Sequence, residues 1–196
     1  MESLLEPSPS NSRRVTLIPS IDCTDSGWNN HPDSHSIVVR GVAQVGDYLQ
    51  QAGIIPSARS IELGLDIVLG NDHGVRDLNR LWRGQDRPTN VLSFPSLEAD
   101  ELAEAMAADS FDGHCGDIYL ALETIEREAI EQNKNFADHL HHLTIHSVLH
   151  IFGFDHHDSA EALAMETIEI NLLQKFGIAN PYELTHLESN EDKAAK

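Results

Sequence analysis

The sequence predicts an α+β fold, a single domain in which a small mixed sheet packs with helices around one central helix. Its 196 residues are enough for one domain with a core of its own. Strand patterns and helix patterns follow one another without regular βαβ alternation, which favours α+β. The segment Phe136–Phe152 is apolar on much of its helical circumference, so it is expected to be the buried central helix.

Four segments have the patterns of strands. The clearest is Ser60–Leu69, in which apolar and polar residues alternate so that one face is apolar. Arg14–Asp22 alternates in the same way, and Gly116–Leu120 is a shorter run of the same kind. Val91–Phe94 is expected to be a short strand ended by Pro95, because proline cannot donate to a sheet ladder.

Four further helices are expected where apolar residues recur at helical spacing between capping residues and glycines. They cover Ile37–Ala52, a segment from Asn71 or Asp72 to Gly84, Glu123–Asn133 and Ser159–Phe176. The second should bury the stripe Val75, Leu78, Leu81 and Trp82. The third should face solvent, and Ser159 should cap the fourth. Residues 23–36 are expected to form a loop.

The domain is expected to span residues 14–180 between two polar ends. Residues 1–13 are expected to be a disordered leader, and residues 181–196 an acidic, flexible tail. Residues 96–110 form an acidic insert that is either a short surface helix or a mobile loop. No apolar run reaches the ~20 residues that cross a bilayer, and no secretory signal opens the chain. We therefore expect a cytoplasmic protein without membrane contact.

The net charge of −19 argues against a protein that coats nucleic acid non-specifically, because phosphate binding relies on Lys and Arg. A local basic groove remains compatible with this charge, since four arginines gather at Arg76, Arg80, Arg83 and Arg87. The two cysteines, Cys23 and Cys115, are too few for a disulfide framework and are expected to be free thiols.

Histidines cluster in and after the central helix. His146 and His150 are four residues apart, so they lie one above the other on the same helical face, where two imidazoles can meet one metal ion. Gly153 permits the left-handed turn that would bring His156, or its neighbour His157, to the same point. Three imidazoles and an open position are typical of a catalytic zinc site. The earlier histidines are expected to be solvated or to support the site from outside: His139, His141 and His142.

Two blocks resemble the motifs of a known family. His146–His156 (HSVLHIFGFDH) is similar to the HxxxHxxxxxH signature of the YbeY family of bacterial endoribonucleases. Leu78–Pro95 (LNRLWRGQDRPTNVLSFP) resembles that family's other hallmark, and Gly116–Ile118 resembles a third block. The likeness spans about residues 61–176. The leader, the acidic insert and the tail depart from it.

The resemblance implies a zincin-like fold, one Zn²⁺ ion and cleavage of single-stranded RNA. It implies action on the 16S rRNA precursor, in maturation of the 3′ end and in ribosome quality control. It selects His146, His150 and His156 as the metal ligands, and Arg83 as the functionally important arginine. Arg83 and His146 are the residues expected to be catalytic. The implied partners are the small ribosomal subunit or a basic ribosomal protein, which the acidic surface would suit.

Several roles stay open at this point. Arg83 is either a phosphate clamp or a surface arginine. Substrate contacts are also expected from Arg80, Arg87, Thr89 and Asn90, although the first two are equally compatible with solvated positions and the last two with turn formation. Asp155 or Asp158 orients a ligand histidine, unless Asp158 caps the final helix. The nucleophile is water or the RNA 2′-hydroxyl.

Two rival functions follow from the same residues. A zinc peptidase of the HExxH type needs a glutamate after its first histidine, and Ser147 stands there, which weighs against a peptidase. The other rival is a ribosome assembly factor with a structural zinc. Structural sites are usually closed by a fourth protein ligand, which this pattern lacks.

Overall fold

One four-stranded sheet organises the chain. The computed structural model describes residues 15–54, 61–98, 101–102, 104 and 113–183. The strands are β1 (Val15–Cys23), β2 (Ile61–Gly70), β3 (Val91–Pro95) and β4 (His114–Ala121). They lie in the order β1-β2-β4-β3, where β1, β2 and β4 are parallel and β3 runs antiparallel to β4 at the edge. The prediction of a small mixed sheet is therefore confirmed.

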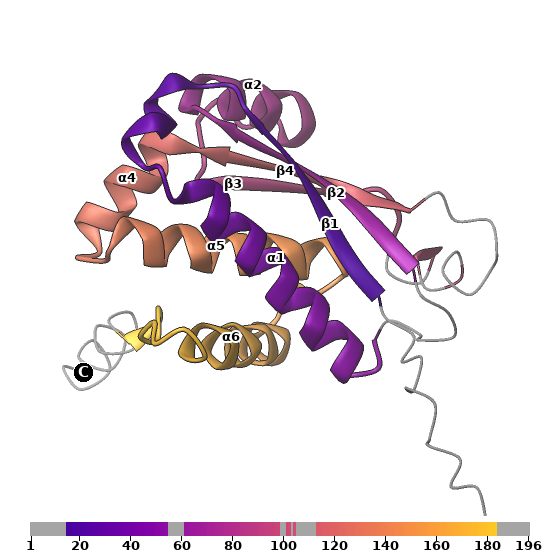
Figure 1. Ribbon diagram of the computed structural model, residues 1–196. Helices are drawn as coiled ribbons and strands as arrows, with labels where there is room; N and C mark the ends of the chain where they lie inside the picture. The colour runs from indigo at the N-terminus through magenta and orange to yellow at the C-terminus, as the bar shows by residue number, and fades with distance from the viewer. Residues whose placement is uncertain (1–14, 55–60, 99–100, 103, 105–112, 184–196) are drawn as a thin grey trace, which may run out of the picture.

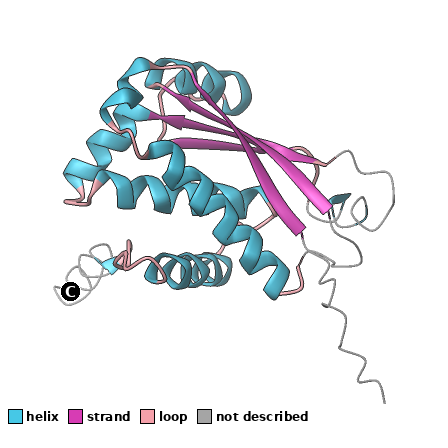
Figure 2. Ribbon diagram, in the orientation of Figure 1, coloured by secondary structure: helices cyan, strands magenta, loops and turns pink. Residues whose placement is uncertain are grey.

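Helices cover the two faces of the sheet unequally (Figures 1 and 2). α1 (Ser34–Gln51) and α5 (Phe136–Ile151) pack on one face, and α6 (Ser159–Gln174) packs against α5 on the side away from the sheet. α4 (Leu122–Glu131) follows β4 directly and contacts α5. Of the described α-helices, α2 (Asp72–Arg83) alone lies on the opposite face, against β3 and β4. The central position predicted for the histidine-bearing helix is confirmed.

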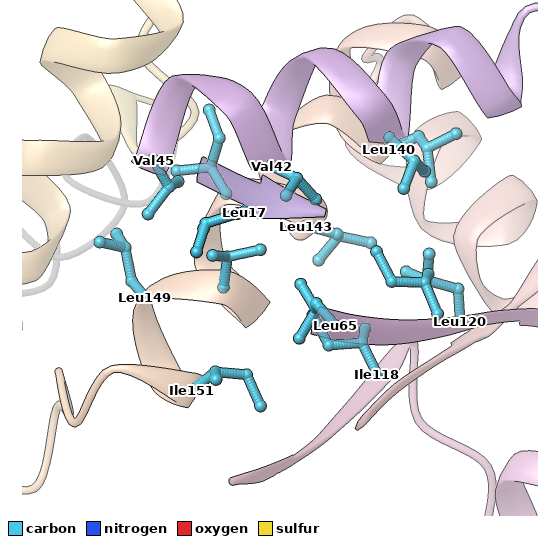
Figure 3. Close-up of a cluster of buried hydrophobic side chains, with 14 of the residues drawn as sticks. Leu17, Val42, Val45, Leu65, Ile118, Leu120, Leu140, Leu143, Leu149 and Ile151 are labelled. Carbon is cyan, nitrogen blue, oxygen red and sulfur yellow. The ribbon is translucent and has the colours of Figure 1, made fainter. Parts of the chain in front are cut away.

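The core lies between the sheet and the helices α1 and α5 (Figure 3). In β2, the alternating residues Leu63, Leu65 and Ile67 are at most 1% exposed, as the alternation predicts. In α5, Leu140, Ile145 and Leu149 are fully buried. Burial of these apolar groups contributes roughly 25 cal/mol for each Å² removed from water. The helix that carries the candidate ligands is consequently one of the most firmly held elements of the fold.

Three local predictions are corrected by the structure. The predicted loop 23–36 contains a 3-10 helix, Ser26–Asn30, because Trp28 is buried there and its Nε1 donates to the Gly70 carbonyl at 2.8 Å. α4 is not wholly solvent-facing, since it buries Ile125 and Ala129. Asp158, not Ser159, caps α6: its carboxylate accepts from the backbone N–H groups of Ala160 and Glu161, the first free donors of the helix.

The predicted apolar stripe of α2 is also partly wrong. Val75 is buried as expected, but Leu81 and Trp82 are 74% and 67% exposed. The helix turns Val75 and Asn79 toward the rest of the fold, and the Asn79 side-chain amide donates to the Arg87 carbonyl at 2.8 Å. No second layer covers the other side of α2 within the described residues, so Leu81 and Trp82 stay largely exposed, whereas Leu78 is half-buried against Val75 and its neighbours.

Most of the predicted leader, insert and tail lies outside the described residues. Leu102, from the predicted insert, is 3% exposed and belongs to the core. Tyr182, from the predicted tail, packs onto the domain through contacts described below. Among the described helices, none combines the length and the apolar character needed to traverse a bilayer.

Replacing Gly116 by alanine is expected to destabilise the fold. A Cβ at this position of β4 would lie 2.6 Å from the Phe94 carbonyl oxygen and 2.7 Å from Ile151 Cδ1. Because backbone and a packed side chain must both shift, we expect a loss of about 1–3 kcal/mol in the free energy of unfolding, measured in urea.

Gly74→Ala is the matched control for Gly116→Ala. In α2, a Cβ at Gly74 meets only the Asn71 side-chain oxygen at 3.6 Å, so this variant is expected to keep or raise stability through better helix propensity. Equal stability of the two alanine variants would contradict the close approach at Gly116.

Candidate metal centre

The first two candidate ligands lie on one face of α5. The Nε2 atoms of His146 and His150 are 3.1 Å apart. Two imidazoles that share a tetrahedral zinc, with Zn–N distances of about 2.0–2.1 Å, place their nitrogens about 3.3 Å apart. The two side chains are half-buried, so they have one side packed and one side open. The pair therefore fits a metal ion of this size without rearrangement.

His156 reaches the pair through the turn that ends α5. Gly153 has a φ of 83°, the left-handed conformation expected of it, and the chain reverses there. The His156 ring centroid lies 5.8 Å from that of His146 and 5.1 Å from that of His150. One nitrogen from each of the three rings lies within 4.8 Å of the others. The structure thus brings the three predicted ligands together.

His157, the alternative third ligand, turns away from the cluster. Its Nε2 lies 2.6 Å from Asp155 Oδ2, and its side chain is 84% exposed. Asp155 also accepts from the His156 backbone N–H at 2.7 Å, so it shapes this turn. Asp158 caps α6 instead. Among the hydrogen bonds of the described residues, neither aspartate accepts from a ligand imidazole, although the charge of Asp155 is felt by His150 and His156.

Glu169 of α6 orients a ligand, and our sequence reasoning missed it. The His146 Nδ1–H donates to Glu169 Oε1 at 2.8 Å. This hydrogen bond fixes the tautomer in which His146 Nε2 carries a lone pair, directed at the cluster. Glu169 is fully buried, on the same face of α6 as Met165 and Leu172. A glutamate within that apolar stripe was the signal available in the sequence.

Glu169 accepts two further hydrogen bonds. One comes from His142 Nε2 at 3.1 Å and the other from the hydroxyl of Tyr182. Burial by itself would raise the pKa of Glu169, but the hydrogen bonds from His142 and His146 lower it to about 2. Glu169 is therefore an anion at neutral pH, and it supports His146 both as an acceptor and as a negative charge.

The environment of His150 keeps its imidazole neutral. Burial, together with the positive charges that His146 and His156 would carry, lowers the pKa of His150 to about 4. A neutral imidazole has a lone pair available for a metal ion at physiological pH. The chemistry of the donor set, three imidazoles with one buried carboxylate behind them, fits a divalent zinc ion.

The histidine cluster opens into a cavity of about 580 Å³. Arg83, at the end of α2, lines this cavity together with the three histidines. Within the described ranges, no hydrogen bond or ion pair holds the Arg83 guanidinium. Its neighbours differ, because Arg76 is paired with Asp86 at 2.7 Å and Arg80 with Asp77 at 3.0 Å. Arg83 is thus the arginine of this segment that faces the candidate centre with its donors available.

The tentative substrate residues are placed in two groups. Thr89 and Asn90 line the cavity, whereas Arg80 and Arg87 do not. The Asn90 side chain also shapes the local turn, since it accepts from the Val91 backbone N–H at 2.7 Å and donates to Glu128 at 2.9 Å. Arg87 donates to Gln85 at 3.2 Å. Glu98, from the start of the acidic insert, also lines the cavity, and we had not singled it out.

Of the two roles expected for the histidines before the ligand pair, a solvated position is wrong for His139 and His141. His139 and His141 are each 3% exposed, and they donate to Glu128 and Gln44 at 3.0 and 3.2 Å. His142 is half-buried and shares Glu169 with His146. His114 begins β4, beside Asp117 at 3.6 Å, and does not line the cavity.

A mixed sheet covered by a central helix that supplies two histidines, with a third from the turn that follows the helix, defines a class of protein with a candidate three-histidine metal centre. The chain belongs to the YbeY family, because the family model described as endoribonuclease YbeY matches residues 38–177. The zincin-like single-domain fold expected of this family is the one described above. The match includes Arg83 and all three candidate ligands.

Curated relatives agree with this assignment. Endoribonuclease YbeY of a Bradyrhizobium species is 37% identical over 85% of this chain and 90% of that protein. The Parvibaculum lavamentivorans protein of the same name is 50% identical over 62% of this chain and 66% of its own length. A solution structure of a Thermotoga maritima protein aligns at 21% identity with a TM-score of 0.43, over 90% of this chain and 93% of that chain.

Replacing Glu169 by glutamine is expected to weaken zinc binding by about 10–100-fold, the usual effect of losing an outer partner of a ligand histidine. The amide keeps the shape but removes the negative charge and replaces one of the two acceptor oxygens by an N–H donor, which then faces either His146 or the pair His142 and Tyr182, all of which donate to Glu169. Competition with a chromogenic chelator measures the affinity. Glu161→Gln, at an exposed position of the same helix, is the control. Unchanged affinity in Glu169→Gln would rule out the orienting role.

Proposed function

We propose that this protein is a zinc-dependent endoribonuclease that cleaves single-stranded RNA, acting on the 16S rRNA precursor in maturation of its 3′ end. The proposal includes a part in ribosome quality control and therefore a cytoplasmic place of action. Its family supports an endoribonuclease role. The single observation that carries it is that Arg83 and the histidine cluster line the same cavity.

The residues in and behind the cavity would have separate roles in RNA cleavage. A zinc ion held by His146, His150 and His156 would supply a Lewis acid and lower the pKa of bound water toward ~7. Arg83 would hold phosphate oxygens through two parallel N–H donors and stabilise negative charge as it develops. Glu169 would keep His146 oriented throughout, because its buried carboxylate is fixed by three donors. Thr89 and Asn90 lie where they could contact the RNA backbone.

Elemental analysis paired with cleavage of a precursor 16S rRNA 3′ fragment tests this function. We expect about one zinc per chain, and cleavage that stops with a chelator and returns with added zinc. Cleavage that persists after zinc removal would overturn the metal dependence. The product ends separate the two nucleophiles: a 2′,3′-cyclic phosphate indicates attack by the 2′-hydroxyl, and its absence favours water.

A peptide is a poorer substrate for this cavity. The Ser147 hydroxyl, at the position of a peptidase's glutamate, is buried and donates to the Leu143 carbonyl at 2.6 Å. It is therefore engaged within α5. A protease assay with zinc present is expected to show no cleavage.

The proposed partners are the small ribosomal subunit and a basic protein of it, which the net charge of −19 favours over naked RNA. Co-sedimentation with isolated subunits tests this association. A chain that sediments with the subunit, carries zinc and yet cuts no RNA would favour the assembly-factor function instead.

A further inference from the structure

An aromatic hollow lies on the face of the sheet that α2 covers only in part. Trp82 is 67% exposed, and its ring centroid lies 6.0 Å from that of Phe94. The Phe94 centroid lies in turn 5.8 Å from that of Tyr119, in an edge-to-face arrangement. The hollow measures about 350 Å³. It is lined by Leu78, Trp82, Phe94, Pro95, Asp117 and Tyr119.

This hollow adjoins the cavity of the candidate metal centre around the edge of the sheet. Pro95 lines both. Successive strand residues point to opposite faces, so Ser93 lines the metal cavity while Phe94 lines the hollow. The same division occurs at the end of α2, where Arg83 lines the cavity and Trp82 the hollow. An RNA strand leaving the cavity across the end of β3 would therefore meet the hollow next.

The chemistry of the lining selects a base over a phosphate. The exposed ring of Trp82, beside the half-buried rings of Phe94 and Tyr119, offers a face on which any nucleobase can stack. Such contacts are the usual means of holding single-stranded RNA. The Asp117 carboxylate would repel a phosphate, whereas it can accept a hydrogen bond from the amino group of a base. Phosphate contacts would thus stay with Arg83 in the neighbouring cavity.

We propose that this aromatic shelf, formed by Trp82, Phe94 and Tyr119, binds one base of the RNA strand next to the phosphate held at Arg83. The inference rests on the proposed function, because it needs RNA in the cavity. It assigns Trp82 a substrate-binding role, whereas the sequence pattern predicted that Trp82 is buried in the apolar stripe of α2.

Leu81 is the control residue that distinguishes specific base binding by Trp82 from general attraction of RNA to exposed apolar side chains. It precedes Trp82 on the same helix and is more exposed, at 74%, but it lines neither the hollow nor the cavity. If exposed apolar groups on α2 merely attracted RNA, Leu81→Ala and Trp82→Ala would weaken binding alike. The shelf requires that only the tryptophan matter.

The test measures binding of the zinc-loaded full chain to 2′-O-methyl octaadenylates with a terminal fluorophore, checked by electrophoresis to remain intact. A set of octamers carries one abasic nucleotide at each position in turn. For the wild type, the octamer that lacks the base on the shelf is expected to bind about tenfold more weakly than the full octamer. In Trp82→Ala the full octamer should lose about the same factor, and the abasic penalty at that position should disappear.

Two further variants and one optical signal complete the test. Trp82→Phe should restore most of the affinity, and Leu81→Ala should match the wild type. The chain has two tryptophans, and Trp28 is buried, so quenching of the exposed Trp82 fluorescence by bound octamer should be lost in Trp82→Phe. An abasic profile unchanged by Trp82→Ala overturns the shelf even if the RNA fragment is still cut. A wild-type chain that neither binds nor cuts RNA overturns the proposed function and the shelf together.

Discussion

Replacing His150 by alanine is expected to leave the chain without its metal ion and without RNA cleavage. The substitution removes one of three nitrogens that lie within 4.8 Å of one another, and among the described residues this group of potential ligand atoms has no fourth member. Losing a residue that only hydrogen-bonds to a metal ligand already lowers metal affinity by about 10–100-fold. Losing a ligand itself should therefore lower it by more than about a hundredfold. Zinc per chain, measured by elemental analysis after dialysis, should fall from about one to near zero.

His157→Ala is the matched control for this experiment. It removes an imidazole from the same cavity, but one that is turned toward Asp155 and away from the cluster. We expect it to keep its zinc. Circular dichroism should show both variants folded, because the core of α5 is formed by other residues. Unchanged zinc in His150→Ala would refute His150 as a ligand, and loss of zinc in His157→Ala would refute the choice of His156.

The convergence of the three candidate ligands was predictable because their geometry is local. An interval of four residues on a helix stacks His146 over His150 whatever the rest of the fold does, and Gly153 then limits how the chain can turn. The spacing alone left His156 and His157 as equal candidates. The family resemblance selected His156, and the side-chain contact of His157 with Asp155, which depends on the exact path of the turn, agrees with that choice.

Glu169 was not predictable in the same way. It lies 23 residues beyond His146, on another helix, and their hydrogen bond depends on how α6 rotates against α5. Burial of a glutamate could be suspected from its place among apolar residues, but its partner could not. The same reasoning applies to the sheet order, which no local pattern encodes.

For Trp82, the helical spacing predicted burial, but the side chain is exposed. Helical spacing groups Trp82 with Val75 and Leu78, but a helix buries only the residues that have protein beneath them. α2 lies on the sparsely covered face of the sheet, and the apolar residues of its last turn, Leu81 and Trp82, are exposed. The exposure of apolar residues was therefore determined by the layers of the fold and not by the sequence period.

Replacing Arg83 by alanine is expected to reduce the rate of RNA cleavage by about 10²–10³-fold, the usual effect of removing a group that stabilises charge in a transition state. The zinc content should stay unchanged, because Arg83 lines the cavity without contacting any of the three histidines through a hydrogen bond in the described structure. Arg83→Lys should recover only part of the rate, since lysine keeps the charge but not the two parallel donors. Cleavage rates at saturating RNA and zinc content would be measured on the same preparations.

Arg127→Ala is the control for a loss of positive charge alone. Arg127 lies on α4, lines no part of the cavity, and donates to Thr124 at 2.9 Å. If Arg83 acts as a clamp on phosphate, only its own substitution slows cleavage. If it acts by general attraction of RNA, both variants should weaken binding, and added salt should remove the difference between them and the wild type. Loss of zinc in Arg83→Ala would contradict the clamp directly, because the arginine would then be supporting the metal centre instead of the substrate.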